Sequence, residues 1–276
     1  MEPSLTGKRV YRHSIAARLT HWLWALAMLV LVMSGLQIFN AAPYLDASDK
    51  SNPAKRVLAI GAREPAADPQ HPVGIVLLFG HPFTTTGLLG YTDDGAGAKT
   101  ERAFPGWATL PGEQDLADGR RWHLFFGWIL TLSIVVYIVA GAIRKDLREL
   151  ILRPSDVPKL LPMQLYYFRL RKEPPPHGTY NPLQKAAYTV VLFVFIPLII
   201  LTGLALSPGV DALAGPITAV FGGRQFARLW HFTLMTLLIG YFLTHMALVF
   251  ATGAWNNIRS MITGWYVLGE HDGVGP

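Results

Sequence analysis

Four long apolar stretches divide this chain, and each is long enough to cross a lipid bilayer. A membrane-spanning helix needs about 20 consecutive, mostly apolar residues. The stretches at 15–39, 122–143, 186–206 and 229–252 meet that requirement, and the last three contain no Asp, Glu, Lys or Arg. The pattern predicts an all-α integral membrane fold, a four-helix transmembrane bundle formed by a single domain over residues 1–276. Pro197 predicts a kink in the third span.

The connections between the spans differ strongly in length and character. The connection 40–121 is rich in Pro and Gly and shows no sustained helical period. Its run Val73 to Phe79 is apolar but too short to span a membrane, and it fits a strand or a turn at the interface. Because long loops are usually functional or disordered, both an ordered partner-binding surface and a solvated insertion remain open. The tail from Trp255 to Leu268 predicts an interfacial helix.

Basic residues indicate how the spans are oriented. The connection 144–181 carries eight Lys and Arg residues, whereas the connection 207–228 carries only Arg224 and Arg228. Under the positive-inside rule, both termini and the 144–181 loop are cytoplasmic, and the 40–121 loop is on the outer side. The formal net charge is +6, and the basic residues flank the spans. This position indicates contact with membrane lipid and argues against nucleic acid as a partner. The first span is longer than the apolar part of a signal peptide, so we expect it to be retained.

Four histidines lie inside the apolar stretches. His231 and His245 are fourteen residues apart in the last stretch, and His21 and His123 lie in the first two. Fourteen residues of α-helix rise about 21 Å and return to within roughly 40° of the same face. Ionisable groups in a membrane span are costly and mark functional sites by default. The histidines are therefore the first candidates for chemistry.

The direction of each span sorts these histidines by depth. His123 and His231 fall near the outer side, and His21 and His245 fall near the cytoplasmic side. Each depth then offers two imidazoles from different helices and no carboxylate, which fits the two axial ligands of a haem better than a zinc or copper site. The chain has no Cys, which excludes thiolate-bound clusters and covalently attached haem. The pattern favours two haem b groups, against hydrogen-bonded structural histidines and proton-relay histidines of a transporter.

Small residues recur on the faces that carry these histidines. Gly35 follows His21 by fourteen residues, Gly127 and Gly141 follow His123 at helical spacings, and Gly203 and Gly240 lie in the last two spans. Glycines of this kind make room for a flat macrocycle, or they simply permit close packing of helices.

The chain resembles the di-haem cytochrome b subunits of Ni,Fe-hydrogenases, formate dehydrogenases and thiosulfate reductases, within the prokaryotic cytochrome b561-like group. The resemblance rests on the segment Arg18 to Trp22, on His123, on the pair His231 and His245, and on the segment Tyr180 to Lys185. It implies a subunit of the bacterial inner membrane that transfers electrons between a periplasmic oxidoreductase and the quinone pool. The long 40–121 loop favours the thiosulfate-reductase-like branch, whose partners are molybdopterin-type. We therefore expect an electron-transfer subunit with no catalytic residues of its own.

The resemblance also implies a quinone site near the inner haem. Asn181 matches a family Asn at the start of span three, and Gln184, Lys185 and Arg18 are weaker candidates. Asn181 is equally readable as a helix cap before Pro182. Five arginines at the span ends fit either haem propionates or interface anchors, and these are Arg18, Arg120, Arg121, Arg224 and Arg228.

An alternative function is that of a stand-alone di-haem superoxide or quinone oxidoreductase. Such an enzyme would use the same four histidines, but it would not need the long 40–121 loop.

Overall fold

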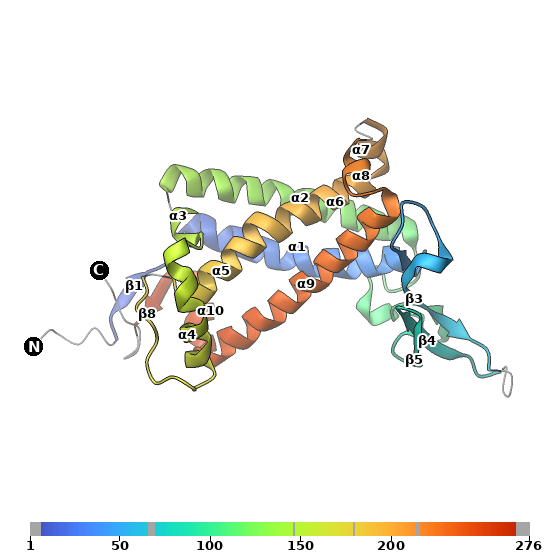
Figure 1. The fold of residues 1–276 in the computed structure, drawn as a ribbon, viewed down its shortest axis with the longest axis horizontal. Coiled ribbons are helices and arrows are strands. Elements are labelled where there is room, and N and C mark those ends of the chain that lie inside the picture. Colours follow the sequence, from blue (N-terminus) through green and yellow to red (C-terminus); the bar gives the residue numbers. More distant parts are fainter. Residues whose placement is uncertain (1–6, 66–69, 146, 179, 214–215, 269–276) are drawn as a thin grey trace, which may run out of the picture. The chain divides into compact units, whose positions relative to one another are not determined.

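The structure is a computed structural model that describes residues 7–65, 70–145, 147–178, 180–213 and 216–268. Within these residues the chain is mostly helical, and four helices are long and apolar enough to cross a membrane (Figure 1). They are α1 (Ile15–Asn40), α2 (Leu116–Arg144), the run Pro182–Leu206 and α9 (Arg224–Ala251). The four predicted spans are confirmed as helices of membrane-spanning length.

The mostly helical fold agrees with the predicted all-α class, and the described part also contains eight short strands. By its internal contacts the chain divides into two compact units, and the four long helices have residues in both. Unit 1 comprises residues 1–22, 133–198 and 237–276, and unit 2 comprises residues 23–132 and 199–236.

Three of the spans begin earlier than their apolar stretches, at Leu116, Pro182 and Arg224. Helix α2 starts at Leu116, where the side chain of Asp115 accepts hydrogen bonds from the backbone N–H groups of Ala117 and Asp118, at 2.8 and 3.0 Å. A carboxylate in this position caps the free N–H groups of a first helical turn. Helix α9 likewise starts at Arg224. The first turns of α2 and α9 include charged side chains, Asp118 and Arg224, so hydropathy alone could not reveal them.

The third span is not a uniform α-helix. It consists of α5 (Pro182–Val190), a π-helical turn (Val191–Phe195) and α6 (Ile196–Leu206). The N–H of Ile196 bonds the carbonyl of Val191, five residues back. Pro197 has no N–H to donate and its ring crowds the preceding turn, so the irregularity expected at Pro197 takes the form of a π turn.

In unit 2 the segment after α1 folds into antiparallel sheet. One sheet has the order β2-β3-β4-β5 and the other pairs β6 with β7. The bounds are β2 (Tyr44–Asp46), β3 (Arg56–Arg63), β4 (Val73–Leu78), β5 (His81–Thr84), β6 (Gly90–Asp93) and β7 (Lys99–Arg102). The apolar run from Val73 is thus a strand, and the structure favours the ordered interpretation of this connection. Unit 2 also contains α7 (Pro208–Leu213) and α8 (Pro216–Val220).

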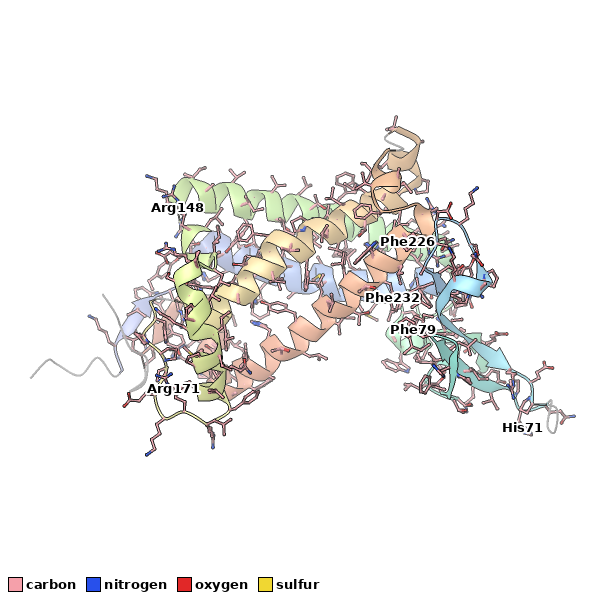
Figure 2. All side chains as sticks on the ribbon, in the orientation of Figure 1. His71, Phe79, Arg148, Arg171, Phe226 and Phe232 are labelled. Carbon is pink, nitrogen blue, oxygen red and sulfur yellow. The ribbon has the colours of Figure 1, made fainter. Side chains whose placement is uncertain are left out.

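A small apolar cluster joins this sheet to the ends of two spans. Its buried members are Phe39, Leu45, Ile60 and Ala103, and Leu229 and Phe232 of α9 pack against it. Phe39 and Phe232 bring their ring centroids within 5.1 Å. Figure 2 shows Phe232 at the α9 end of the sheet and His71 at the opposite end. The sheet is therefore anchored on the helices of its own unit.

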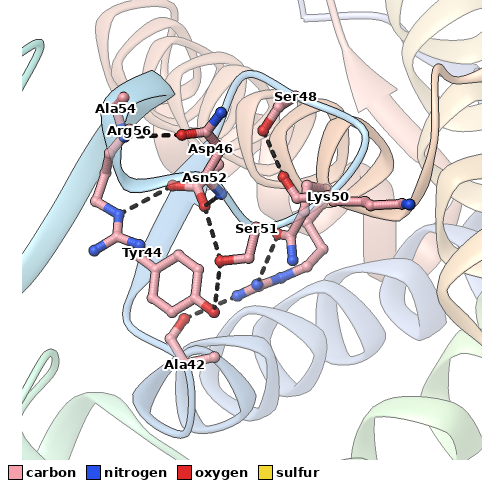
Figure 3. A network of polar contacts seen from close by, with 11 residues as sticks. Ala42, Tyr44, Asp46, Ser48, Lys50, Ser51, Asn52, Ala54 and Arg56 are labelled. Atoms are coloured by element: carbon pink, nitrogen blue, oxygen red, sulfur yellow. Dashed lines mark hydrogen bonds and ion pairs between the residues drawn. The ribbon is translucent and has the colours of Figure 1, made fainter.

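A buried carboxylate organises the turn between β2 and β3. The Asp46 side chain, fully buried, accepts hydrogen bonds from Arg56 Nε (3.0 Å), the Asn52 backbone N–H (2.8 Å) and Ser51 Oγ (3.2 Å) (Figure 3). Arg56 also lies over the ring of Tyr44, 4.2 Å from its centroid. A buried charge is tolerated only when it is paired and hydrogen-bonded, and Asp46 meets both conditions.

In unit 1 the two terminal segments pair with each other. Strand β1 (Arg9–Tyr11) runs antiparallel to β8 (Trp265–Val267). Helix α10 (Ala254–Thr263) precedes β8 and ends at Gly264, whose φ of +87° favours glycine. The predicted C-terminal helix is confirmed for this range, but its last residues form a strand, because they pair with β1.

The segment between the second and third spans also folds within unit 1. It contains α3 (Leu147–Leu150), a 3-10 helix (Pro154–Lys159) and α4 (Leu160–Tyr167). Both α3 and α4 pack against α5.

Candidate cofactor sites

Unit 1 brings together the first pair of histidines. His21 of α1 and His245 of α9 have ring centroids 6.3 Å apart and ring planes inclined at 55°. The ring of Tyr241 stacks against His245 at 6.1 Å, and Trp22 meets His21 edge-on at 5.3 Å. The Nδ1 atom of His21 is buried and makes no hydrogen bond within the described structure.

Unit 2 brings together the second pair. His123 of α2 and His231 of α9 have ring centroids 6.1 Å apart, with ring planes inclined at 66°. Each ring contacts a hydroxyl group from another helix: Ser34 Oγ lies 3.0 Å from His123 Nδ1, and Thr202 Oγ1 lies 2.9 Å from His231 Nδ1. The two pairs that the structure forms are those that the depth argument predicted.

The spacing of the rings fits a metal held between two imidazoles. With a metal–nitrogen distance of about 2.0 Å and a ring radius of about 1.1 Å, two rings on opposite sides of one metal have centroids about 6 Å apart. Among the described residues, no group of three or more His, Cys, Asp or Glu side chains is placed to hold a metal ion. A site with only two protein ligands needs its remaining ligands from elsewhere, which is the arrangement of axial ligands to haem iron.

The predicted glycines divide into two groups. A Cβ on Gly35 would lie 3.2 Å from His123 Cε1, and one on Gly203 would lie 3.3 Å from His231 Cε1. A Cβ on Gly127 or Gly240 would have no protein atom within 4 Å, and one on Gly141 would lie against the side chain of Leu147. Two of the five glycines therefore make room for an imidazole ring of a neighbouring helix, a role that their spacing did not predict.

Several of the predicted arginines are engaged with nearby groups. In unit 2, Arg228 donates to the carbonyl of Ala42 at 2.8 Å and Arg224 to that of Leu206 at 3.1 Å. Arg121 pairs with Asp118 at 2.7 Å on the surface. In unit 1, Arg18 donates to the carbonyl of Ile262. These contacts tie helices and loops together, as interface anchors would.

Arg18 also borders an open cavity of about 290 Å³ in unit 1. The cavity is lined by Ile15, Arg18, Leu19, Trp22, Met261 and Ile262. The Nε atom of Arg18 is buried and makes no hydrogen bond within the described structure.

The other quinone candidates lie on the first turn of α5. Asn181 is buried and caps the helix, accepting from the Gln184 N–H at 2.9 Å while Gln184 accepts from the Asn181 N–H at 3.1 Å. The amide of Asn181 also donates to the Tyr167 hydroxyl at 3.0 Å. Lys185 forms an ion pair with Asp156 at 3.1 Å. The predicted helix cap is confirmed, and all three side chains have local partners, whereas Arg18 contacts α10.

Comparison with known proteins decides the family. The family model described as prokaryotic cytochrome b561 matches residues 12–264, which is most of the chain. This chain belongs to the prokaryotic cytochrome b561 family. It is therefore a membrane electron-transfer protein of a family that carries b-type haem, and its four apolar helices agree with a multi-pass membrane protein.

A curated relative extends this result. The chain is 26% identical over 251 residues to the Azospira oryzae protein named "Putative protein-methionine-sulfoxide reductase subunit YedZ1". The match covers 88% of this chain and 92% of the relative. The relative is thus named as a subunit of an oxidoreductase.

Sequence reasoning missed two residues of this cytochrome b561 protein, Ser34 and Thr202. Both are fully buried, and each contacts a histidine from a neighbouring helix. A weak signal was present, because each directly precedes one of the two glycines that face an imidazole, in the pairs 34–35 and 202–203. Only the packing of the helices reveals what the pairs contact.

Proposed function

We propose that this chain carries electrons across the membrane through two b-type haems. One haem would be held by His21 and His245 and the other by His123 and His231. The observation that carries this proposal is the formation of two imidazole pairs, at 6.3 and 6.1 Å between centroids, each from two different spans and without a third metal-ligand side chain among the described residues.

The orientation of the chain supports a direction for the conduit. Strands β1 and β8 pair with each other, which supports placing both termini on the same side of the membrane, as an even number of spans also would. With the basic 144–181 segment cytoplasmic, both termini are cytoplasmic in the bacterial inner membrane. The haem of His21 and His245 then lies toward the cytoplasm, and that of His123 and His231 lies toward the periplasm.

The partners follow from this orientation. The Azospira oryzae relative is named as a subunit of a reductase, which supports an oxidoreductase partner for this chain, and we propose a periplasmic one of the molybdopterin type. The folded sheet of 40–121 would provide its docking surface. The quinone would exchange electrons with the haem of His21 and His245, with Asn181, Gln184, Lys185 and Arg18 as candidate contacts.

The protein's own residues have a limited task in this function. Haem iron supplies reversible one-electron transfer between its ferrous and ferric states. The histidines hold the two groups in the spans, and His231 and His245 on one helix set the distance between the two sites along α9. The surrounding apolar side chains exclude water, which helps to set the potential of each haem.

Purification of the intact protein from membranes tests this proposal. We expect a red protein with two haems b per chain, both reduced by a quinol, and a co-purifying oxidoreductase subunit. A protein without a Soret band would exclude the haem proposal and favour histidines that relay protons. Two haems with superoxide oxidation and no partner would favour the stand-alone oxidoreductase.

A further inference from the structure

Two hydroxyl groups contact the second histidine pair in the same way. Ser34 of α1 reaches Nδ1 of His123 on α2, and Thr202 of α6 reaches Nδ1 of His231 on α9, at 3.0 and 2.9 Å. Both hydroxyl side chains have no exposed surface, so water does not compete for either contact. The repetition on two separate helix pairs calls for a common explanation.

The hydrogen atoms of these hydroxyls are already in use. Ser34 Oγ donates to the carbonyl of Val30 at 2.6 Å, and Thr202 Oγ1 donates to that of Ile199 at 3.0 Å. A hydroxyl has one hydrogen to donate and two lone pairs that accept. Each oxygen therefore offers a lone pair to the imidazole, and Nδ1 of the imidazole must carry the proton.

This arrangement determines which nitrogen of each ring can bind a metal. A neutral imidazole has one protonated nitrogen and one nitrogen with a free lone pair. With the proton on Nδ1, the lone pair is on Nε2, which becomes the ligand atom. Metal-binding histidines typically donate their other N–H to a protein acceptor, which fixes the tautomer and raises the basicity of the ligand.

The neighbouring glycines allow the rings to come this close. A Cβ on Gly35 or Gly203 would lie 3.2 or 3.3 Å from the Cε1 atom of the same ring that the hydroxyl contacts. These separations are tighter than ordinary van der Waals contact. The hydroxyl and the glycine thus act together on one imidazole.

The other pair lacks this support. Nδ1 of His21 is buried without a hydrogen-bond partner in the described structure, and His245 is flanked by the ring of Tyr241. The hydroxyl contacts are therefore a property of one candidate haem site and not a general feature of the spans.

We propose that Ser34 and Thr202 are positioning residues that fix the tautomer and the orientation of His123 and His231 and thereby tune one of the two haems. This inference rests on the proposed function, because it concerns the haem that these histidines would hold. Each hydroxyl makes its imidazole a stronger donor, which stabilises ferric iron and lowers the midpoint potential of that haem.

The test replaces each hydroxyl in the intact, haem-loaded protein. In Thr202→Val and Ser34→Ala we expect the midpoint potential of one haem to rise and its low-spin electron paramagnetic resonance signal to shift. The affinity of the protein for that haem should fall about 10- to 100-fold. The second haem should keep its potential and its signal. Thr202→Ser keeps the hydroxyl and should therefore keep the wild-type potential, signal and haem affinity.

A matched control comes from the same helix as His231. Thr236 of α9 is exposed, and its hydroxyl donates only to the carbonyl of Phe232 at 2.9 Å. Thr236→Val should leave both haems unchanged. If Thr202→Val and Ser34→Ala leave both potentials and signals as in the wild type, or shift both haems equally, the inference is wrong although the di-haem function stands. A wild-type protein without haem would instead overturn the proposed function.

Discussion

The guanidinium group of Arg102 donates a hydrogen bond to Gln37 Oε1 at 3.3 Å and thereby joins β7 to the last turn of α1. Arg102 is only 2% exposed, and it also donates to Thr109 Oγ1 at 3.0 Å and to the carbonyls of Asp94 and Gly112, at 2.7 and 3.0 Å. One buried side chain thus connects three parts of the 40–121 segment to a membrane-spanning helix.

Replacement of Arg102 should loosen this segment. In Arg102→Leu the buried acceptors lose a charged donor, and we expect a loss of about 2–4 kcal/mol in the stability of the segment. Amide hydrogen exchange of residues 90–113 measures it. Arg63→Leu, at an exposed position at the end of β3, is the control and should change stability by less than about 0.5 kcal/mol. Equal protection in both variants would contradict the prediction.

Removal of one histidine should empty one site only. In His245→Ala or His21→Ala we expect one haem per chain instead of two, because each proposed haem has its own pair of histidine ligands. The retained haem should still be reducible by dithionite, but quinol should no longer reduce it. The pyridine haemochrome spectrum counts the haems, and His81→Ala, at an exposed position in β5, should keep both. Loss of both haems together would contradict the separation of the two sites.

Substitution of two glycines should have opposite consequences. Alanine stabilises a helix by roughly 0.5–1 kcal/mol relative to glycine, so Gly209→Ala in α7, where a Cβ would have no protein atom within 4 Å, should preserve both haems. In Gly35→Ala the new methyl lies 3.2 Å from His123 Cε1 and must displace the ring by a few tenths of an ångström. We expect a shifted Soret band and a weaker hold on that haem. Identical spectra in the two variants would show that the haem does not depend on the close approach of His123 to Gly35.

Acid should destabilise the β2–β3 turn. Burial by itself raises the pKa of Asp46, but the hydrogen bonds from Arg56, Asn52 and Ser51 outweigh it and hold that pKa below its ordinary value. A lowered pKa in the folded state means that the ionised carboxylate stabilises the fold at pH values above the ordinary pKa of Asp. This contribution is lost as the pH falls through the folded-state pKa.

Hydrogen exchange of residues 44–63, corrected for the intrinsic rate at each pH, measures this effect. We expect protection to fall below about pH 4 in the wild type. In Asp46→Asn protection should already be low at pH 7 and should change little with acid. A wild-type segment that keeps its protection at pH 2.5 would contradict the prediction.

Asn181 allows its two predicted roles to be separated. Serine is also a good helix cap, whereas alanine is not and costs about 1 kcal/mol. If the amide contacts quinone, Asn181→Ser should keep the stability of α5 but raise the KM for quinol, and Asn181→Ala should affect both. Steady-state haem reduction by quinol, together with thermal unfolding in detergent, provides the two measurements. A wild-type KM in Asn181→Ser would leave the cap as the role of this residue.

The spans and the histidine pairs could be predicted because both depend on local sequence and on simple geometry. Apolar length locates the helices, and the spacing of His231 and His245 places both on one face. The sheet could not be predicted in the same way, because strands such as β2 and β5 are short and exist only through pairing with distant segments. The continuously apolar run from Val73 allowed either a strand or a turn at the interface, and only its pairing with β3 and β5 makes it a strand.

Contacts between helices were the least accessible to prediction. The Ser34–Gly35 pair is only a weak signal, and it does not identify His123, 89 positions later, as the partner of the Ser34 hydroxyl. Pro197 predicts a kink but not the π turn that precedes it, because the sequence identifies the missing N–H but not how the backbone compensates for it. Such features depend on the way neighbouring helices pack.

The pairing of β1 with β8 means that the chain closes on itself. Arg9 faces Val267 across the ladder, so a short linker can join β1 to β8 without rearranging any of the long helices. The turn between Leu78 and His81 offers new ends, since Phe79 and Gly80 there have positive φ and Phe79 is exposed. A circular permutant opened at this turn would keep all four long helices and both histidine pairs, while its new ends would lie in unit 2 instead of unit 1.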